Sequence, residues 1–415
     1  MTILETQGLS AKNAERTLCV AGSAKKDAAL EAIAAAIETR QEEILAANAQ
    51  DVAAAQEAGM RASLVDRLSL DAGRIAGIVE GVRQVKALPD PIGQVIRESR
   101  RPNGLIIGKR RVPLGVIGMI YEARPNVTVD AAVLCLKAGN VVILRGGKEA
   151  FRSNKAFVAI MRDALESAGL PRDCISLVED TSRESARELM NLTGYLDVLI
   201  PRGGAGLIRT VVENAKVPVI ETGVGVCHIY VHGEADLDMA ARILFNAKCS
   251  RPSVCNAAEC LLVDRAVARD FLPMVWQLLK SKDVELRGCP LARDILGQAV
   301  RPAATEDWDT EFGDYILAVK VVSGYEEAVD FIREHGTGHS EAIVTNSYFT
   351  AQRFLDEVDA AAVYVNASTR FTDGFEFGLG AEIGISTQKM HARGPMGLEE
   401  LTSSKFVVYG TGQVR

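Results

Sequence analysis

The stretch Val141-Val-Ile-Leu-Arg-Gly-Gly-Lys148 decides the fold, because an apolar run passes through two glycines into a helical pattern that begins near Ser153. Such a run is typical of a strand that is buried on both faces of a parallel sheet. The same alternation recurs along the chain, with further apolar runs at residues 115–120, 175–178, 198–200 and 217–220. Alternating strands and helices predict an α/β protein whose parallel sheet is covered by helices on both faces.

The rest of the chain divides around this pattern. Residues 10–88 are helical in character, and a second α/β unit is expected from about residue 227 to residue 366. Residues 93–112 differ, because Pro102-Asn103-Gly104 separates two apolar stretches and predicts a β-hairpin. We expect N-terminal helices and a first α/β domain over 1–225, a second α/β domain over 226–370, and a return to the first domain over 371–415.

Composition narrows the class of protein. A chain of 415 residues is expected to form two or three domains, and its 48% hydrophobic and 24% charged residues are ordinary for a globular protein. A net charge of -7 argues against nucleic acid as the main partner, and no apolar run reaches membrane-spanning length. The N-terminus lacks the layout of a signal peptide. Eight scattered cysteines without a Cys-x-x-Cys pair indicate a reducing cytoplasm and argue against a zinc site.

Cys255 differs from the other cysteines in its surroundings. It lies in a short polar turn, between Arg251-Pro-Ser253 and Asn256, and an apolar run at 260–263 that predicts a buried strand follows at once. A cysteine that a turn presents beside a cation loses its proton more easily and can act as a nucleophile. A small buried residue beside a strand is the alternative that this segment leaves open.

Two glycine-rich loops are candidates for a dinucleotide site, because ligands of open parallel sheets bind at the strand ends. One loop contains Gly146 and Gly147, and the other contains Gly203 and Gly204 before a helix over 207–214. Glycines let the backbone approach a phosphate, and a helix N-terminus attracts it. Neither loop carries the full G-x-G-x-x-G pattern. Each loop is therefore as compatible with a tight turn that binds no ligand as with a phosphate site.

Four longer stretches carry a family resemblance that covers nearly the whole chain: residues 112–128, 136–149, 252–259 and 378–398. By these motifs the chain resembles the aldehyde dehydrogenase superfamily. The segment that runs from His391 to Leu398 is typical of the members that act on γ-glutamyl phosphate. The resemblance implies two Rossmann-like parallel-sheet domains plus a small β oligomerisation element. It also implies reduction of L-glutamyl 5-phosphate to L-glutamate 5-semialdehyde with a nicotinamide cofactor, in proline biosynthesis.

The resemblance assigns roles to particular residues. Cys255 falls at the nucleophile that forms a thioacyl intermediate, which makes 226–370 the catalytic domain, and Asn126 falls at the asparagine whose amide helps to form the oxyanion hole. The cofactor-binding residues that it implies are Arg145, Gly146, Gly147, Lys148, Gly203, Gly204, Glu311 and Phe312. Arg145 stands where the family usually has a lysine. The residues alone leave NADPH and NADH open, and the positive charge of Arg145 and Lys148 favours NADPH. A turn cap at Asn126 and a solvated charge at Glu311 are the structural alternatives.

The substrate is anionic at both ends, so cations are expected around it. Arg124 is a candidate for the acyl phosphate, and Lys389, His391 and Arg393 are candidates for a carboxylate or the phosphate. Glu382 is a candidate for the α-ammonium group. A surface charge or a structural salt bridge is the alternative for each of these residues.

One departure from the family concerns Glu221-Thr-Gly-Val-Gly225, where hydrolytic members carry Glu-Leu-Gly-Gly-Lys. An enzyme that exchanges its acyl group with phosphate needs no activated water, so we do not expect Glu221 to act as a base. Two alternatives to the implied activity remain. In the first, the chain is an enzyme that acts on another semialdehyde or acyl phosphate. In the second, it is an inactive scaffold that binds a dinucleotide.

The hairpin at 93–112 and the C-terminal strand at 404–409 have no obvious sheet of their own in the sequence. Unpaired strand edges seek partners, and in the resembling superfamily such elements bridge subunits. We therefore expect a homodimer or homotetramer, with pairing of both segments inside a monomer as the alternative. A transient contact with glutamate 5-kinase, which makes the unstable acyl phosphate, is a further expectation.

Overall fold

The computed structural model describes the backbone of residues 1–415 and every side chain except those of Ser63 and Ala299. The chain folds as two compact units. Unit 1 comprises Met1–Thr222, Gly378–Gly384 and Met396–Arg415, and unit 2 comprises Gly223–Phe377 and Ile385–Pro395. Unit 2 thus includes the short segment Ile385–Pro395, which the sequence grouped with the return to the first domain.

Unit 1 is built on a parallel sheet with the strand order β5-β4-β3-β6. Its strands are β3 (Val116–Tyr121), β4 (Val141–Arg145), β5 (Ile175–Leu177) and β6 (Val198–Arg202). Every residue of β3 is buried, as are the first four residues of β4, which is what the apolar runs predicted. The predicted parallel pairing of these strands is confirmed.

Several helices of unit 1 lie where the sequence predicted them, but the N-terminal helical region begins at Ile3 rather than at residue 10, and the helix at Arg183–Met190 was not predicted. The N-terminal helices are α1 (Ile3–Leu18), α2 (Ser23–Thr39), α3 (Gln41–Glu57), α4 (Ala62–Leu68) and α5 (Ala72–Ala87), and those that alternate with the strands are α6 (Pro125–Lys137), α7 (Phe151–Ser167), α8 (Arg183–Met190) and α9 (Ala205–Asn214). The strand predicted at residues 217–220 is wrong, because Val219 forms only an isolated bridge with Leu199. Pro218 in this run has no N–H to donate to a ladder.

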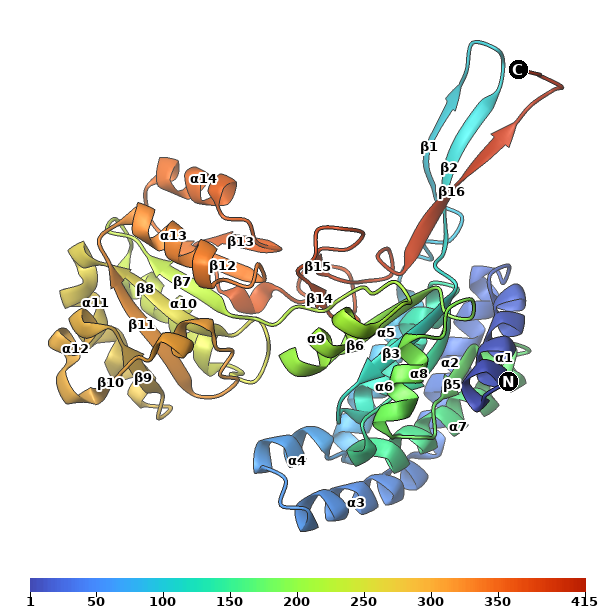
Figure 1. The fold of residues 1–415 in the computed structure, drawn as a ribbon, viewed down its shortest axis with the longest axis horizontal. Coiled ribbons are helices and arrows are strands. Elements are labelled where there is room, and N and C mark those ends of the chain that lie inside the picture. Colours follow the sequence, from blue (N-terminus) through green and yellow to red (C-terminus); the bar gives the residue numbers. More distant parts are fainter. The chain divides into compact units, whose positions relative to one another are not determined.

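The arm is a separate antiparallel sheet of unit 1, formed by β1 (Val95–Arg100), β2 (Ile106–Pro113) and β16 (Thr402–Tyr409). It extends away from the parallel sheet of the same unit (Figure 1). The predicted hairpin is confirmed as the β1–β2 pair. The C-terminal strand does not stand alone, because β16 pairs with β2 from Thr402 opposite Pro113 to Tyr409 opposite Ile106. All residues of β1 are exposed.

Unit 2 contains a parallel sheet in the order β10-β9-β11-β8-β7-β12-β13. Its strands are β7 (Cys227–Val231), β8 (Ala258–Asp264), β9 (Glu285–Gly288), β10 (Val300–Pro302), β11 (Ile316–Val322), β12 (Ser340–Val344) and β13 (Ala362–Val365), and the short pair β14 (Ile385–Ser386) and β15 (Gly394–Pro395) is antiparallel. The helices are α10 (Leu237–Cys249), α11 (Arg265–Lys280), α12 (Pro290–Leu296), α13 (Tyr325–His335) and α14 (Tyr348–Glu357). The expectation of a second parallel α/β unit is confirmed.

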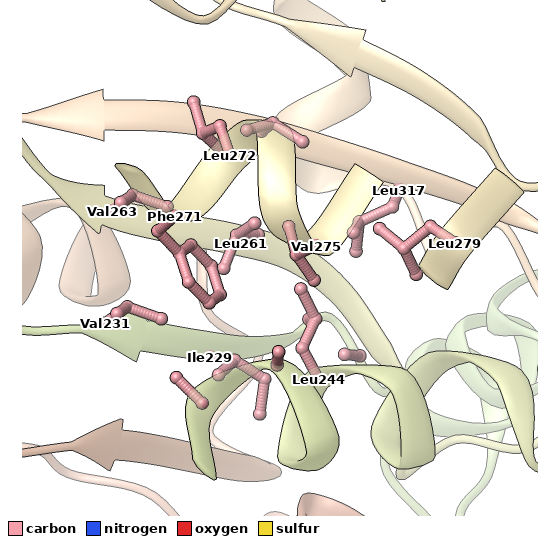
Figure 2. Close-up of a cluster of buried hydrophobic side chains, with 14 of the residues drawn as sticks. Ile229, Val231, Leu244, Leu261, Val263, Phe271, Leu272, Val275, Leu279 and Leu317 are labelled. Carbon is pink, nitrogen blue, oxygen red and sulfur yellow. The ribbon is translucent and has the colours of Figure 1, made fainter. Parts of the chain in front are cut away.

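The core of unit 2 follows from the alternation of side chains along its central strands. Ile229 and Val231 of β7 face one side, where they pack with Leu244 of α10 and with Phe271 and Val275 of α11 (Figure 2). Tyr230 of β7 and Leu262 of β8 face the other side and pack with residues of α13 and α14. Because helices cover both faces of this sheet, its polar candidate residues lie at the ends of the strands. Among the described residues, no helix is both long and apolar enough to cross a membrane.

Candidate active site

Several candidate residues of unit 2 precede its strands. Gly225 lies just before β7, Cys255 before β8, and Glu311 and Phe312 before β11. These strands are parallel neighbours, so their amino ends meet at one edge of the sheet. We call this the amino edge of unit 2. The preceding helix α10 ends at Cys249, so it presents its C-terminus and not its N-terminus to Cys255.

Cys255 lies in the turn between α10 and β8 and is half-buried. Its backbone carbonyl accepts a hydrogen bond from the Cys227 thiol at 3.2 Å. Ala257 N–H donates to the Val254 carbonyl at 3.0 Å and closes the turn. A Cβ atom placed on Gly225 would lie 1.5 Å from the Cys255 carbonyl oxygen, so the backbone before β7 packs directly against the backbone of Cys255.

Most other thiols of the chain are poorly suited to be nucleophiles. Burial raises the pKa of Cys249 to about 11 and that of Cys174 to about 12. Burial also raises the pKa values of Cys135, Cys227 and Cys260. Because the thiolate is the reactive form, these shifts disfavour Cys249 and Cys260, the cysteines nearest to Cys255 in sequence.

The loop with Glu311 and Phe312 is held from both sides. Gly313 has a φ of 60°, which favours glycine, and its N–H donates to Glu259 at 3.2 Å. Glu259 is buried and pairs with the buried Lys248 at 2.6 Å. Burial raises the pKa of Glu259 to about 7 and lowers that of Lys248. Phe312 lies under the guanidinium of Arg287, 5.1 Å from the ring centre.

The candidate residues at 122–148 and 203–204 in unit 1 lie at the carboxyl ends of its parallel strands, which we call the carboxyl edge of unit 1. Arg124 is the N-cap residue of α6, and Asn126 lies in the first turn of that helix. The Asn126 side-chain amide donates to Asp130 Oδ2 at 3.0 Å, one helical turn further on. Burial raises the pKa of Asp130 to about 6, against the opposing effects of Asn126 and Arg202.

The loop after β4 contains Arg145, Gly146, Gly147 and Lys148. The Arg145 guanidinium donates to the carbonyls of Thr181 and Ser182 at 2.7 and 2.8 Å, and burial lowers its pKa. A Cβ on Gly146 would lie 2.2 Å from the buried Asn154 amide nitrogen, so only glycine fits there without a shift of Asn154. Lys148 is exposed at the start of the short 3-10 helix η1 (Lys148–Ala150), which leaves it accessible to an anion.

The start of α9 differs from the sequence-based picture of a phosphate site. Gly204 N–H donates to Glu122 Oε2 at 3.2 Å. A Cβ on Gly203 would lie 2.7 Å from the carboxyl carbon of Glu122, so both glycines accommodate this side chain. The helix N-terminus therefore already holds an anion that belongs to the protein.

The proposed substrate residues fall into both units. Lys389 and Arg393 of unit 2 share one partner, since each forms an ion pair with Asp359, and the Arg393 contact is 2.6 Å. These contacts lower the pKa of Asp359. His391 of the same loop has a φ of 70°, while Arg124 and Glu382 belong to unit 1. No group of three or more described His, Cys, Asp or Glu side chains is arranged to hold a metal ion.

Comparison with known proteins places this arrangement in a family. The family model for the aldehyde dehydrogenase family matches residues 7–291. The chain belongs to the aldehyde dehydrogenase family. It is 60% identical, over 98% of its length and 97% of the relative, to gamma-glutamyl phosphate reductase of Carboxydothermus hydrogenoformans.

Solved structures of aldehyde dehydrogenase fold support the same placement. The crystal structure of gamma-glutamyl phosphate reductase from Thermotoga maritima is 49% identical, covers all of both chains and gives a TM-score of 0.97. An engineered glycolyl-CoA reductase with bound NADP+ is 16% identical over 97% of this chain and 96% of its own, with a TM-score of 0.70, and it shares the fold.

Some residues of this aldehyde dehydrogenase family member were not singled out from its sequence. Asp130 contacts the candidate residue Asn126, while Glu259 and Asn256 hold Gly313 and Thr372, with Gly313 next to Phe312 and Asn256 next to Cys255. Asp130 was accessible to sequence reasoning, because a spacing of four residues on a helix predicts its contact with Asn126. Partners that lie far away in sequence leave no such local signal.

Proposed function

We propose that this chain reduces L-glutamyl 5-phosphate to L-glutamate 5-semialdehyde and phosphate with NADPH, in proline biosynthesis. The observation that carries the proposal is the 60% identity over nearly the whole chain to a protein named gamma-glutamyl phosphate reductase. The half-buried Cys255 in its turn, beside cysteines with raised pKa values, agrees with a thiolate mechanism.

Cys255 acts as the nucleophile in this proposal. Its thiolate attacks the γ-carbonyl carbon, a C–S bond forms, and phosphate leaves with the electron pair of the broken C–O bond. The Asn126 amide and the Cys255 backbone N–H stabilise the oxyanion of the tetrahedral intermediate. NADPH, when bound, supplies a hydride. As the aldehyde forms, the C–S bond breaks and Cys255 returns to the thiolate. Asn126 lies in unit 1 and Cys255 in unit 2, and their pairing in one site rests on the family resemblance.

We assign the cofactor to the carboxyl edge of unit 1 and its nicotinamide ribose to Glu311 and Phe312 of unit 2. The loop with Gly146 and Gly147 fits a ribose phosphate, because exposed Lys148 supplies a positive charge beside it. This charge favours NADPH over NADH. Binding of a phosphate at Gly203 and Gly204 requires Glu122 to leave Gly204 first, since two anions at one helix N-terminus repel each other.

The substrate residues are assigned with different support. Arg124, Glu382 and His391 remain candidates for the phosphate, the α-ammonium and a carboxylate. Lys389 and Arg393 already share Asp359, so their positive charge is partly balanced within the protein. Glu221 has no assigned role, because transfer to phosphate needs no activated water.

We further propose a homodimer or homotetramer held partly by the arm. The β1 strand is exposed along its whole length, and Phe406 and Val408 of β16 are exposed as well.

A location in the reducing cytoplasm agrees with the state of the eight cysteines, which are all free thiols. A transient contact with glutamate 5-kinase would shorten the path of the unstable acyl phosphate.

The reverse reaction tests the proposal conveniently. We expect NADP+ to be reduced when glutamate 5-semialdehyde and phosphate are both present, and no reduction when either is left out. NAD+ in place of NADP+ tests the cofactor, and a panel of other semialdehydes tests the substrate. Phosphate-independent reduction, or faster reduction with another semialdehyde, would contradict the proposed activity. An absence of turnover with every substrate, although Cys255 is alkylated, would indicate an inactive dinucleotide-binding scaffold.

A further inference from the structure

Asn256, the residue that follows Cys255, is fixed by one short segment from far along the chain. This segment is η5 (Thr369–Phe371) together with Thr372, which follows β13. The Asn256 side-chain nitrogen donates to the carbonyls of Arg370 at 3.3 Å and Thr372 at 2.9 Å. The Arg370 guanidinium donates to the Asn256 side-chain oxygen, and the Thr369 hydroxyl donates to the Asn256 backbone carbonyl at 2.7 Å.

Two of these hydrogen bonds, from Asn256 to Thr372 and from Thr369 to Asn256, are buried and two are partly buried, which makes them costly to lose. Asn256 is 4% exposed, and Thr369 and Thr372 are fully buried. When a buried amide loses its hydrogen-bond partners, the protein is destabilised more than when an exposed hydrogen bond is lost, because no water molecule replaces the buried partners. The clamping segment is itself anchored, since the Thr372 hydroxyl contacts Ser340 of β12 and Tyr364 of β13, both at 2.7 Å.

Together with Cys227 and Gly225, this clamp fixes the peptide that joins Cys255 to Asn256. The Cys227 thiol and the backbone at Gly225 hold the Cys255 carbonyl, and the clamp holds Asn256 on the other side. The side chain of Cys255 therefore extends from a Cα atom that is held on its carbonyl side. A displacement of about 1 Å at a reacting atom can cost on the order of 10²-fold in rate, so such a clamp is a means of positioning.

We propose that Asn256, clamped by Thr369, Arg370 and Thr372, is a positioning residue for the nucleophile Cys255. It holds the sulfur and the Cys255 N–H in the mutual position that acyl transfer needs, and it does not touch the substrate. This inference rests on the proposed function only in taking Cys255 as the nucleophile.

Two substitutions test the clamp. Asn256→Asp keeps the size of the side chain but turns a donor into an acceptor that faces two carbonyls. We expect kcat to fall by on the order of 10²-fold, with the KM for NADPH within about twofold of the wild type. Thr369→Val removes one hydroxyl from the clamp, and we expect kcat to fall by about five- to tenfold, while Thr369→Ser, which keeps the hydroxyl, restores it. Asn346→Asp, at an exposed position of the same unit, is the matched control and should behave as the wild type.

Alkylation of Cys255 by iodoacetamide provides a readout that does not depend on turnover. The pH midpoint of alkylation should stay unchanged in Thr369→Val, because this substitution adds no charge near the thiol. The inference is overturned if folded Asn256→Asp and Thr369→Val both keep wild-type kcat, or if the alkylation midpoint of Thr369→Val moves along with kcat. If Asn256→Asp does not fold, Thr369→Val and Thr369→Ser decide the question. A wild-type protein that alkylates at Cys255 but shows no phosphate-dependent turnover would instead refute the proposed function.

Discussion

The two parallel sheets hold their candidate residues at opposite edges. In unit 1, Asn126 and the loop with Lys148 follow strands, at points where α6 and η1 begin. In unit 2, Cys255 and Glu311 precede strands, at points where the preceding helices have already ended. A helix N-terminus offers free N–H groups and a partial positive charge, whereas the end of a helix offers carbonyls.

This difference has a consequence for how each site is built. At the carboxyl edge of unit 1, Asn126 has its side-chain partner Asp130 within one helix. At the amino edge of unit 2, residues more than a hundred positions away along the chain fix the turn of Cys255. We therefore expect substitutions around Cys255 to act through long-range packing and those around Asn126 to act locally.

The largest effect is expected at the amino edge itself. Cys255→Ser should abolish turnover, because a serine hydroxyl is far less ionised than a thiol near neutral pH. Cofactor binding, measured by fluorescence titration, should stay unchanged, since the substitution leaves unit 1 intact. Substantial residual turnover, or inactivation by alkylation of Cys249 or Cys260 while Cys255 stays free, would show that the nucleophile lies elsewhere.

At the carboxyl edge, Asn126→Ala should lower kcat by roughly 10²–10³-fold with little change in cofactor affinity. The reason is that one hydrogen-bond donor to a developing oxyanion accounts for an effect of this size. Steady-state kinetics of the reverse reaction measure it. An unchanged kcat would mean that Asn126 serves only to stabilise α6 through its contact with Asp130.

Gly225→Ala tests the long-range packing at the amino edge. Its new Cβ would lie 1.5 Å from the Cys255 carbonyl oxygen, so the backbone of one segment has to shift. We expect kcat to fall by on the order of 10²-fold if the turn of Cys255 is the part that moves. Gly206→Ala is the matched control, because a Cβ there meets no atom within 4 Å. Wild-type kcat in Gly225→Ala would show that the turn tolerates displacement.

A smaller effect is expected from Asp130→Ala, which removes the local partner of Asn126. A hydrogen bond contributes about 1 kcal/mol, which corresponds to a loss of about five- to tenfold in kcat. The double variant with Asn126→Ala should be no slower than Asn126→Ala alone, because Asp130 acts through Asn126. Additive losses in the double variant would argue for an independent role of Asp130.

The smallest effect on turnover is expected from the arm, which belongs to neither edge. We expect sedimentation at micromolar concentration to give at least twice the 44.6 kDa chain mass. Phe406→Asp, at a residue that is 60% exposed on β16, should lower the oligomer mass and change the kcat of the remaining species less than twofold. A wild-type protein that sediments near 44.6 kDa would refute the bridging role.

Local sequence patterns anticipated most of the fold. The apolar runs predicted β3, β4 and β8, because strands of a buried parallel sheet carry apolar residues on both faces. The run at 217–220 misled us, since Pro218 cannot join a ladder and only Val219 forms a bridge. The pairing of β16 with β2 was only the alternative in the sequence analysis, because the two segments are far apart in sequence and neither shows its partner.

For the candidate site, the sequence indicated residue types better than their contacts. Cys255 stood out through its polar turn and Asn126 through the family motif. The glycines at 203 and 204 are candidates for a phosphate site, and in the structure the Gly204 N–H donates to Glu122. Lys389 and Arg393 are candidates for a carboxylate or the phosphate, with a salt bridge as the alternative, and in the structure both pair with Asp359. Such partners depend on how distant loops fold together, which a local pattern does not contain.

The contact between Gly225 and Cys255 also limits how this chain can change its chemistry. Hydrolytic relatives have a lysine where Gly225 stands, and here even a methyl group would strike the Cys255 carbonyl. A single substitution toward the hydrolytic motif would therefore force the backbone of Gly225 or of Cys255 to shift. We expect laboratory evolution to yield a hydrolytic variant only after the loop at residues 223–226 has been remodelled. Acyl transfer to phosphate and acyl transfer to water are therefore separated by a backbone rearrangement as well as by side chains.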